Sequence, residues 1–97
     1  MIVSFKDEAT ADIFNGIASK KALKACPQSL WANARRKLDQ LNFAANLEDL
    51  RVPPGNQLEA LKGDRSGQFS IRINQQYRVC FVWMSEGATE VEIVDYH

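Results

Sequence analysis

The sequence is poor in the residues that build metal centres and disulfide frameworks. It has one histidine and two cysteines among 97 residues. Cys26 and Cys80 lie far apart in the chain and form neither a Cys-x-x-Cys pair nor a metal-spaced cluster. We therefore expect no metal ion and no cofactor, because a zinc site needs several such ligands. Two isolated thiols are typical of a reducing cytosol, and both are predicted to be structural.

Long apolar runs and secretory features are also lacking. No run reaches the roughly 18 apolar residues that a transmembrane helix needs, so no membrane partner is expected. The N-terminal residues Met1–Asp7 lack the basic and apolar regions of a secretory signal. Glycine and proline are scarce, and no internal repeat occurs. These absences predict a cytoplasmic globular protein with a single domain, residues 1–97.

Neither sign of charge is in excess, since 12 basic residues balance 12 acidic ones. Their distribution is uneven, however. Between Ile13 and Arg78 there are 11 lysines and arginines against 5 acidic residues, a net charge of +6, and the two ends together carry −6. A basic middle can form a positive face that suits a phosphate-bearing partner. A merely solvated surface gives the same pattern, so charge alone does not decide between the two.

The first half of the sequence has the apolar spacing of helices. After a short predicted strand at 2–5, Asp7 is a suitable N-cap for a helix that starts near Glu8 and ends at the polar stretch 19–21. Pro27 fits the first turn of a second helix. That helix carries one apolar stripe, in which residues recur every three or four positions. The stripe consists of Leu30, Ala34, Leu38, Leu41 and Ala45.

The second half changes to the alternating pattern of strands. The sequence Pro53-Pro54-Gly55-Asn56 ends the helical half. Strands are predicted at 69–73, 77–83 and 89–94, where β-branched and aromatic residues are frequent. Helices followed by an antiparallel meander predict an α+β fold, in which two N-terminal helices pack on one face of a small twisted sheet.

The hairpin between the first two of these strands determines where its arginines lie. A loop at 74–76 stacks apolar residues on apolar residues, whereas a shorter loop turns the core residues of one strand outward. The same register places Arg72 directly opposite Arg78. Opposed like charges destabilise a sheet, and an anion between them would explain the pair. Extending the register across a loop at 85–88 would bring Asp95 beside Arg78.

Several side chains are candidates for chemistry on a phosphodiester. They are Lys62, Arg65, Arg72, Arg78, Tyr96 and His97. Cleaving RNA without a metal requires a base for the 2′-hydroxyl, cations for the charged intermediate and an acid for the leaving oxygen. Arginine and lysine suit phosphate oxygens, and histidine has an unperturbed pKa near neutrality. Taken singly, a C-terminal histidine is more often an exposed bystander, and a terminal tyrosine is an ordinary strand aromatic.

Residues 58–81, the sequence 53–56 and the ending Asp95-Tyr96-His97 resemble the HigB toxins of the RelE/ParE superfamily, in particular the GraT-like subgroup. The resemblance covers nearly the whole chain, beginning with Met1-Ile2-x-Ser4-Phe5. It implies the RelE-like microbial ribonuclease fold. It also implies the toxin of a type II toxin–antitoxin system. Such a toxin is an endoribonuclease, or mRNA interferase, that enters the ribosomal decoding site, cuts the bound messenger RNA and thereby stops translation and growth.

The resemblance further implies roles for individual residues. Lys62 and Arg78 would contact the scissile phosphate, and residues 95–97 would complete the catalytic site. Toxins of this group with a His-Pro-Leu-Lys motif have a histidine three residues before the lysine, where this sequence has Glu59. Either Glu59 replaces that histidine as the base, or the C-terminal residues suffice.

From residue type and this match, we assign Lys62, Arg72 and Arg78 to holding the phosphate. His97 is the leading acid–base group, and Tyr96 stacks on the substrate or assists proton transfer. These roles form a hypothesis that truncating the two terminal residues would test.

The remaining basic residues have two interpretations each. Arg65 is either a phosphate contact or a structural turn residue. Arg35, Arg36 and Lys37 on the second predicted helix form either a solvated face or a docking patch for ribosomal RNA, whose binding weakens steeply with salt. The partners implied by the resemblance are a HigA-like helix-turn-helix antitoxin, the ribosome and messenger RNA.

Two alternative functions stay open from the sequence. Some toxins of this superfamily, the ParE type, poison DNA gyrase, and a toxin of this fold can also block the ribosome without cutting RNA. Lys62 and the ending 95–97 favour a nuclease, since a purely binding toxin needs no acid–base group. The missing upstream histidine keeps the non-cleaving binder open. Transcripts cut at a fixed codon phase would separate the nuclease from both.

Overall fold

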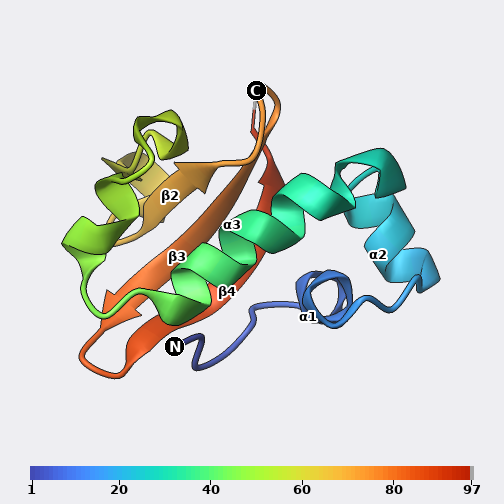
Figure 1. Ribbon diagram of the computed structural model, residues 1–97, viewed down its shortest axis with the longest axis horizontal. Helices are drawn as coiled ribbons and strands as arrows, with labels where there is room; N and C mark the ends of the chain where they lie inside the picture. Colours follow the sequence, from blue (N-terminus) through green and yellow to red (C-terminus); the bar gives the residue numbers. More distant parts are fainter. Residues whose placement is uncertain (97) are drawn as a thin grey trace.

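The computed structural model describes residues 1–96 and consists of helices packed on one face of a four-stranded antiparallel sheet (Figure 1). The strands lie in chain order, β1-β2-β3-β4. The elements are α1 (Glu8–Asn15), α2 (Lys20–Ala25), α3 (Trp31–Phe43), β1 (Glu59–Ala60), β2 (Phe69–Arg72), β3 (Tyr77–Met84) and β4 (Gly87–Asp95). The predicted α+β class is confirmed. In the described residues, no helix is long and apolar enough to cross a membrane.

The helical half contains one short helix beyond the two that the sequence predicts. α1 begins as expected after Asp7, whose side chain accepts a hydrogen bond from the Thr10 N–H at 2.8 Å. It ends at Gly16, which adopts the left-handed conformation. The polar stretch that follows then starts α2, because the Ser19 hydroxyl accepts from the Ala22 N–H and caps a new helix.

α3 places its apolar stripe in the core between the helices and the sheet. The fully buried stripe residues are Ala34, Leu38 and Leu41. The helix ends at Phe43, so the predicted stripe residue Ala45 lies beyond it and is exposed. Pro27 does not occupy the first turn of the helix. It precedes a 3₁₀ turn, η1 (Gln28–Leu30), which leads into α3.

The two cysteines are buried and unpaired, as expected of structural thiols. Burial raises the pKa of the Cys26 thiol to about 11, and burial also raises the pKa of Cys80. The Cys26 carbonyl accepts a hydrogen bond from the Trp31 indole N–H at 2.9 Å. Both thiols are therefore protonated and inaccessible near neutral pH, which is the opposite of a reactive cysteine.

The N-terminal segment runs beside β4 without forming a regular strand. In place of the predicted strand at 2–5, the structure has two isolated parallel bridges, to Ala88 and to Val91. The Met1 backbone lies directly against Gly87 of β4, which has a φ of +135°. A Cβ atom there would lie 2.0 Å from the Met1 carbonyl oxygen, so only glycine fits this position.

The predicted register of the β2–β3 hairpin is confirmed, and Arg72 lies directly opposite Arg78. The extension into β4 is wrong by one residue. The turn into β4 is two residues shorter than predicted, and a bulge between Cys80 and Val82 restores only one residue of that difference. Asp95 therefore pairs with Tyr77 instead of lying opposite Arg78.

Candidate functional site

Strand alternation divides the side chains of the sheet between two faces. One face packs against the helices and holds core residues such as Ile71 and Val79. The other, which we call the outer face, points away from the helices (Figure 1). Two rows of directly opposed residues cross the outer face. They are Glu59, Ser70, Cys80 and Glu92 in one row, and Arg72, Arg78 and Val94 in the other.

Arg78 is the only charged side chain among residues 1–96 that is buried, with 9% of its surface exposed. Its Nε donates a hydrogen bond to Ser70 Oγ at 2.7 Å, and its Nη2 donates to the Gln57 carbonyl at 2.6 Å. Glu59 Oε1 lies 3.8 Å from the same Nη2. A buried charge persists only with such acceptors. These acceptors offset the cost of burying Arg78 opposite Arg72.

Arg72 and Lys62 are cations with unused hydrogen-bonding capacity. Arg72 lies beside Arg78 across the β2–β3 pair and is half-buried. Lys62 is exposed and follows β1, three residues after Glu59. Within the part of the chain that the structure describes, neither side chain makes a hydrogen bond or an ion pair. Both are accessible to an incoming anion, and Arg72 lies next to Arg78, a cation that is already held in place.

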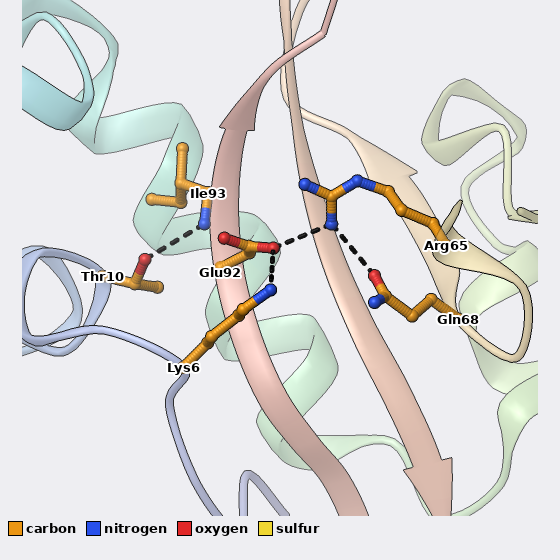
Figure 2. A network of polar contacts seen from close by, with 6 residues as sticks. All are labelled: Lys6, Thr10, Arg65, Gln68, Glu92 and Ile93. Carbon is orange, nitrogen blue, oxygen red and sulfur yellow. Dashed lines mark hydrogen bonds and ion pairs between the residues drawn. The ribbon is translucent and has the colours of Figure 1, made fainter. Parts of the chain in front are cut away.

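Arg65 occupies a different part of the outer face and has a carboxylate partner. It ends a 3₁₀ turn, η4 (Gly63–Arg65), and its Nη1 donates to Glu92 Oε1 at 2.8 Å and to Gln68 Oε1 at 3.1 Å. Lys6 Nζ lies 3.4 Å from the same Glu92 oxygen. Figure 2 shows Arg65 and Lys6 approaching Glu92 from opposite sides. The hydrogen bond with Glu92 raises the pKa of Arg65. This network favours the structural interpretation of Arg65.

The C-terminal candidates lie at the end of β4. Asp95 follows Val91 and Ile93 in the alternation, so it belongs to the helix-facing side of the sheet, and Gln76 Nε2 donates to both of its carboxylate oxygens at 3.2 Å. Tyr96 is next in sequence and half-exposed, and its backbone N–H donates to the Gln76 carbonyl at 2.6 Å. His97 lies outside the described residues.

The basic cluster on α3 is on the helical side of the molecule and is not part of the outer face. Arg35 and Arg36 are exposed, and Arg36 Nη1 donates to Asn33 Oδ1 at 2.9 Å. Lys37 points elsewhere: its Nζ donates to Asn56 Oδ1 at 2.6 Å. Burial, and to a lesser extent the charge of Arg36, lowers the pKa of Lys37. The cluster therefore divides into two exposed arginines and one lysine with a buried partner.

Several residues that shape this site are absent from the sequence-based candidates. Ser70 and Gln57 supply the acceptors for Arg78, and Glu92 is the acceptor for Arg65. Ser70 gives a weak signal in the sequence, because it is a small polar residue between Phe69 and Ile71 in an otherwise apolar strand. Gln57 acts through its backbone carbonyl, and no sequence pattern identifies that role.

Comparison with known proteins relates this chain to toxins. Residues 3–97 match the HigB-like toxin family, described as the RelE-like toxin of type II toxin–antitoxin system HigB. The chain is 38% identical over 84 residues to Toxin HigB-1 of Vibrio cholerae serotype O1, covering 87% of this chain and 85% of the relative. It is also 42% identical over 55 residues to an uncharacterized protein of Haemophilus influenzae, covering 57% of this chain and 54% of that protein.

Proposed function

Because the chain belongs to the family of HigB-like toxins, we propose that it stops growth by cutting messenger RNA on the ribosome without a metal ion. Membership in the family makes it a RelE-like toxin of a type II toxin–antitoxin system, with endoribonuclease activity as the general function. Dependence on the ribosome, independence of metal and the role of each residue are the specific content of the proposal.

The observation that carries the proposal is the pairing of Arg72 with the buried Arg78. Its guanidinium is fixed by Ser70 and Gln57, and Arg72 beside it has no protein partner among residues 1–96. Lys62 lies on the neighbouring segment with its ammonium group equally unused. In this proposal the three cations bind the scissile phosphate and stabilise the negative charge that develops on it. That stabilisation is the contribution a metal ion would otherwise make.

Proton transfer is assigned to the three C-terminal residues and to Glu59. His97 is the leading acid–base group, Tyr96 stacks on a base or assists the transfer, and Asp95 completes the C-terminal group. Glu59 is the candidate for the base at the position of the family's upstream histidine. Its carboxylate lies 3.8 Å from Arg78 Nη2, so a base at this position would act next to a phosphate held by Arg78.

Docking on the ribosome is assigned to a separate surface. Arg35 and Arg36 are exposed on α3, away from the outer face, and can contact ribosomal RNA backbone while the outer face holds messenger RNA. The proposed place of action is the cytoplasm. The proposed antitoxin is HigA-like, with a helix-turn-helix domain, and is encoded with the toxin.

The test is to map messenger RNA 5′ ends after brief induction of the wild type and of the His97→Ala variant. We expect new ends at a fixed codon phase in the wild type and a loss of at least about 100-fold in the variant, the lower limit of the usual contribution of a general acid or base. A matched Glu90→Ala variant, altered on an exposed β4 residue, should cut like the wild type.

A second arm uses purified ribosomes programmed with a synthetic messenger. Replacing the ribose at the cut site by 2′-deoxyribose should abolish cleavage, because the 2′-hydroxyl is the proposed nucleophile. Cutting of the deoxy substrate would refute attack by the 2′-hydroxyl. Growth arrest without cut transcripts would refute the nuclease assignment and point to the ribosome blocker or to the gyrase poison.

A further inference from the structure

Asn56 is a fully buried polar residue at the end of the 3₁₀ turn η3 (Pro54–Asn56). Its Oδ1 accepts a hydrogen bond from Lys37 Nζ at 2.6 Å. Its Nδ2 donates to Gln40 Oε1 at 3.0 Å, to the Leu50 carbonyl at 3.1 Å and to the Val52 carbonyl at 3.5 Å. One side chain thus ties the loop after α3 to the surface of α3 itself.

The anchoring of Asn56 affects the backbone of the next residue, Gln57. Gln57 adopts the left-handed backbone conformation, with a φ of 46°, which residues other than glycine rarely adopt. Its N–H donates to the Pro54 carbonyl at 3.1 Å, so the turn closes just before the backbone changes direction. This conformation directs the Gln57 carbonyl at Arg78 Nη2, 2.6 Å away. The anchoring of Asn56 stabilises a backbone conformation that is unfavourable by itself.

The Gln57 carbonyl accepts a hydrogen bond from Arg78 Nη2, and the Ser70 hydroxyl accepts one from Arg78 Nε. Since the group is planar, two hydrogen bonds from different nitrogens fix both its position and its plane. Nη1 makes no hydrogen bond within residues 1–96 and is the nitrogen left for a ligand. The direction of Nη1 therefore depends on where the Gln57 carbonyl lies.

We propose that Asn56, together with Lys37, is a positioning residue for Arg78, acting through the Gln57 carbonyl. The chain of contacts runs from α3 through Lys37 and Asn56 to the Gln57 backbone and ends at the guanidinium. This inference rests on the proposed function, in which Arg78 holds the scissile phosphate. It gives Lys37 a role within the site, different from that of the exposed Arg36 next to it.

The first experiment is single-turnover cleavage of messenger RNA on programmed ribosomes by Asn56→Ala toxin, corrected for the folded fraction. We expect the maximal rate to fall about 10- to 100-fold, the loss that a misplacement of about 1 Å can cause, with little change in the concentration at half-saturation. Thr10→Val is the matched control. Thr10 is also fully buried, on α1, and accepts a hydrogen bond from the Ile93 N–H of β4 (Figure 2). Within residues 1–96 it has no hydrogen bond to the segment that holds Arg78, so this variant should keep the maximal rate.

Coupling to Arg78 separates positioning from general destabilisation. In an Arg78→Ala background, Asn56→Ala should cause no further loss of rate, because the group it positions is gone. Losses that multiply in the double variant would overturn the proposal. Lys37→Met removes only the hydrogen bond between Lys37 and Asn56, and it should lower the maximal rate. Arg36→Met should instead raise the concentration of ribosomes at half-saturation. If Lys37→Met raised the concentration at half-saturation and left the maximal rate unchanged, the role of Lys37 would be overturned.

A measurement without ribosomes keeps the inference distinct from the proposed function. In ¹⁵N spectra of the isolated toxin, the Arg78 Nε–H signal should be shifted or broadened by Asn56→Ala, while the Arg65 signal should not change. If the wild-type toxin cuts no RNA, the proposed function fails and this measurement still tests the positioning of Arg78. An Arg78 signal identical in the variant and the wild type would overturn the proposal in either case.

Discussion

Replacing Ser70 by alanine is the most direct test of how the protein holds a buried arginine. Ser70 is fully buried, and its hydroxyl accepts the hydrogen bond from Arg78 Nε at 2.7 Å. The substitution removes a single oxygen atom and leaves almost no cavity, so the loss of this bond dominates its effect. The Gln57 carbonyl and Glu59 still face the other side of the guanidinium. The variant is therefore expected to fold, with Arg78 held on one side only.

The magnitude follows from the charge of the donor. A hydrogen bond to a charged group contributes about 1.5–3 kcal/mol to the free energy of unfolding, and we expect Ser70→Ala to lose that amount. For a domain of this size, each 1 kcal/mol corresponds to a fall in Tm of roughly 4–8 °C. Messenger cleavage should fall as well, because the guanidinium plane loses one of its two fixed points.

Urea unfolding followed by circular dichroism measures this loss. Ser66→Ala, which alters an exposed serine in the loop before β2, is the matched control and should change the free energy of unfolding by less than about 0.5 kcal/mol. In an Arg78→Met background, Ser70→Ala should cost clearly less than in the wild type, because the charged donor is absent. A loss below about 0.5 kcal/mol for Ser70→Ala itself would refute the reasoning.

Three further predictions follow from the geometry. Gly87→Ala should lower the free energy of unfolding by about 2–5 kcal/mol, because the backbone is strained and hydrogen bonds are lost as the N-terminal segment is displaced. Gly55→Ala, with no atom within 4 Å of its added Cβ, should change it by less than about 0.5 kcal/mol in the same urea assay. Reversing the charges of Arg35 and Arg36 should lower co-sedimentation with ribosomes and flatten its dependence on salt; unchanged co-sedimentation would remove them from docking. The Cys26 thiol should resist alkylation in the folded toxin below about pH 11 and react on unfolding; rapid alkylation at pH 8 would contradict its burial.

The pairing of Arg72 with Arg78 could be predicted because it depends on local sequence alone. A three-residue loop and two strands of clear alternation leave one register that keeps both apolar faces together. The position of Asp95 depends on a bulge between Cys80 and Val82, and no residue in that strand marks it. An error of one residue moves a side chain to the other face of the sheet, which is why the same reasoning succeeded for one hairpin and failed for the next.

The acceptors around Arg78 could not be predicted for a related reason. The Gln57 carbonyl points at the arginine only because the backbone is left-handed there and because Asn56 is anchored on α3. Both conditions arise from contacts between segments far apart in the sequence. The short helix α2 was not predicted, because six residues are too few for a periodic pattern. Ser19 before Lys20 is the one signal for it, as an N-cap residue.

The net charge of the basic middle overstates what the folded protein offers to RNA. Arg78 and Arg65 direct their guanidinium groups at protein acceptors, and Lys37 is bound to a buried amide. Arg72 on the outer face and Lys62 after β1 are the candidates for phosphate binding whose cationic groups have no partner in residues 1–96. Affinity for nucleic acid scales with the number of phosphates that cations neutralise. Because these free cations are few, they bind unstructured RNA weakly. A site with a fixed arginine and few free charges can position a phosphate well but cannot capture a messenger by itself. This division supports the proposal that the ribosome presents the substrate and supplies most of the binding surface.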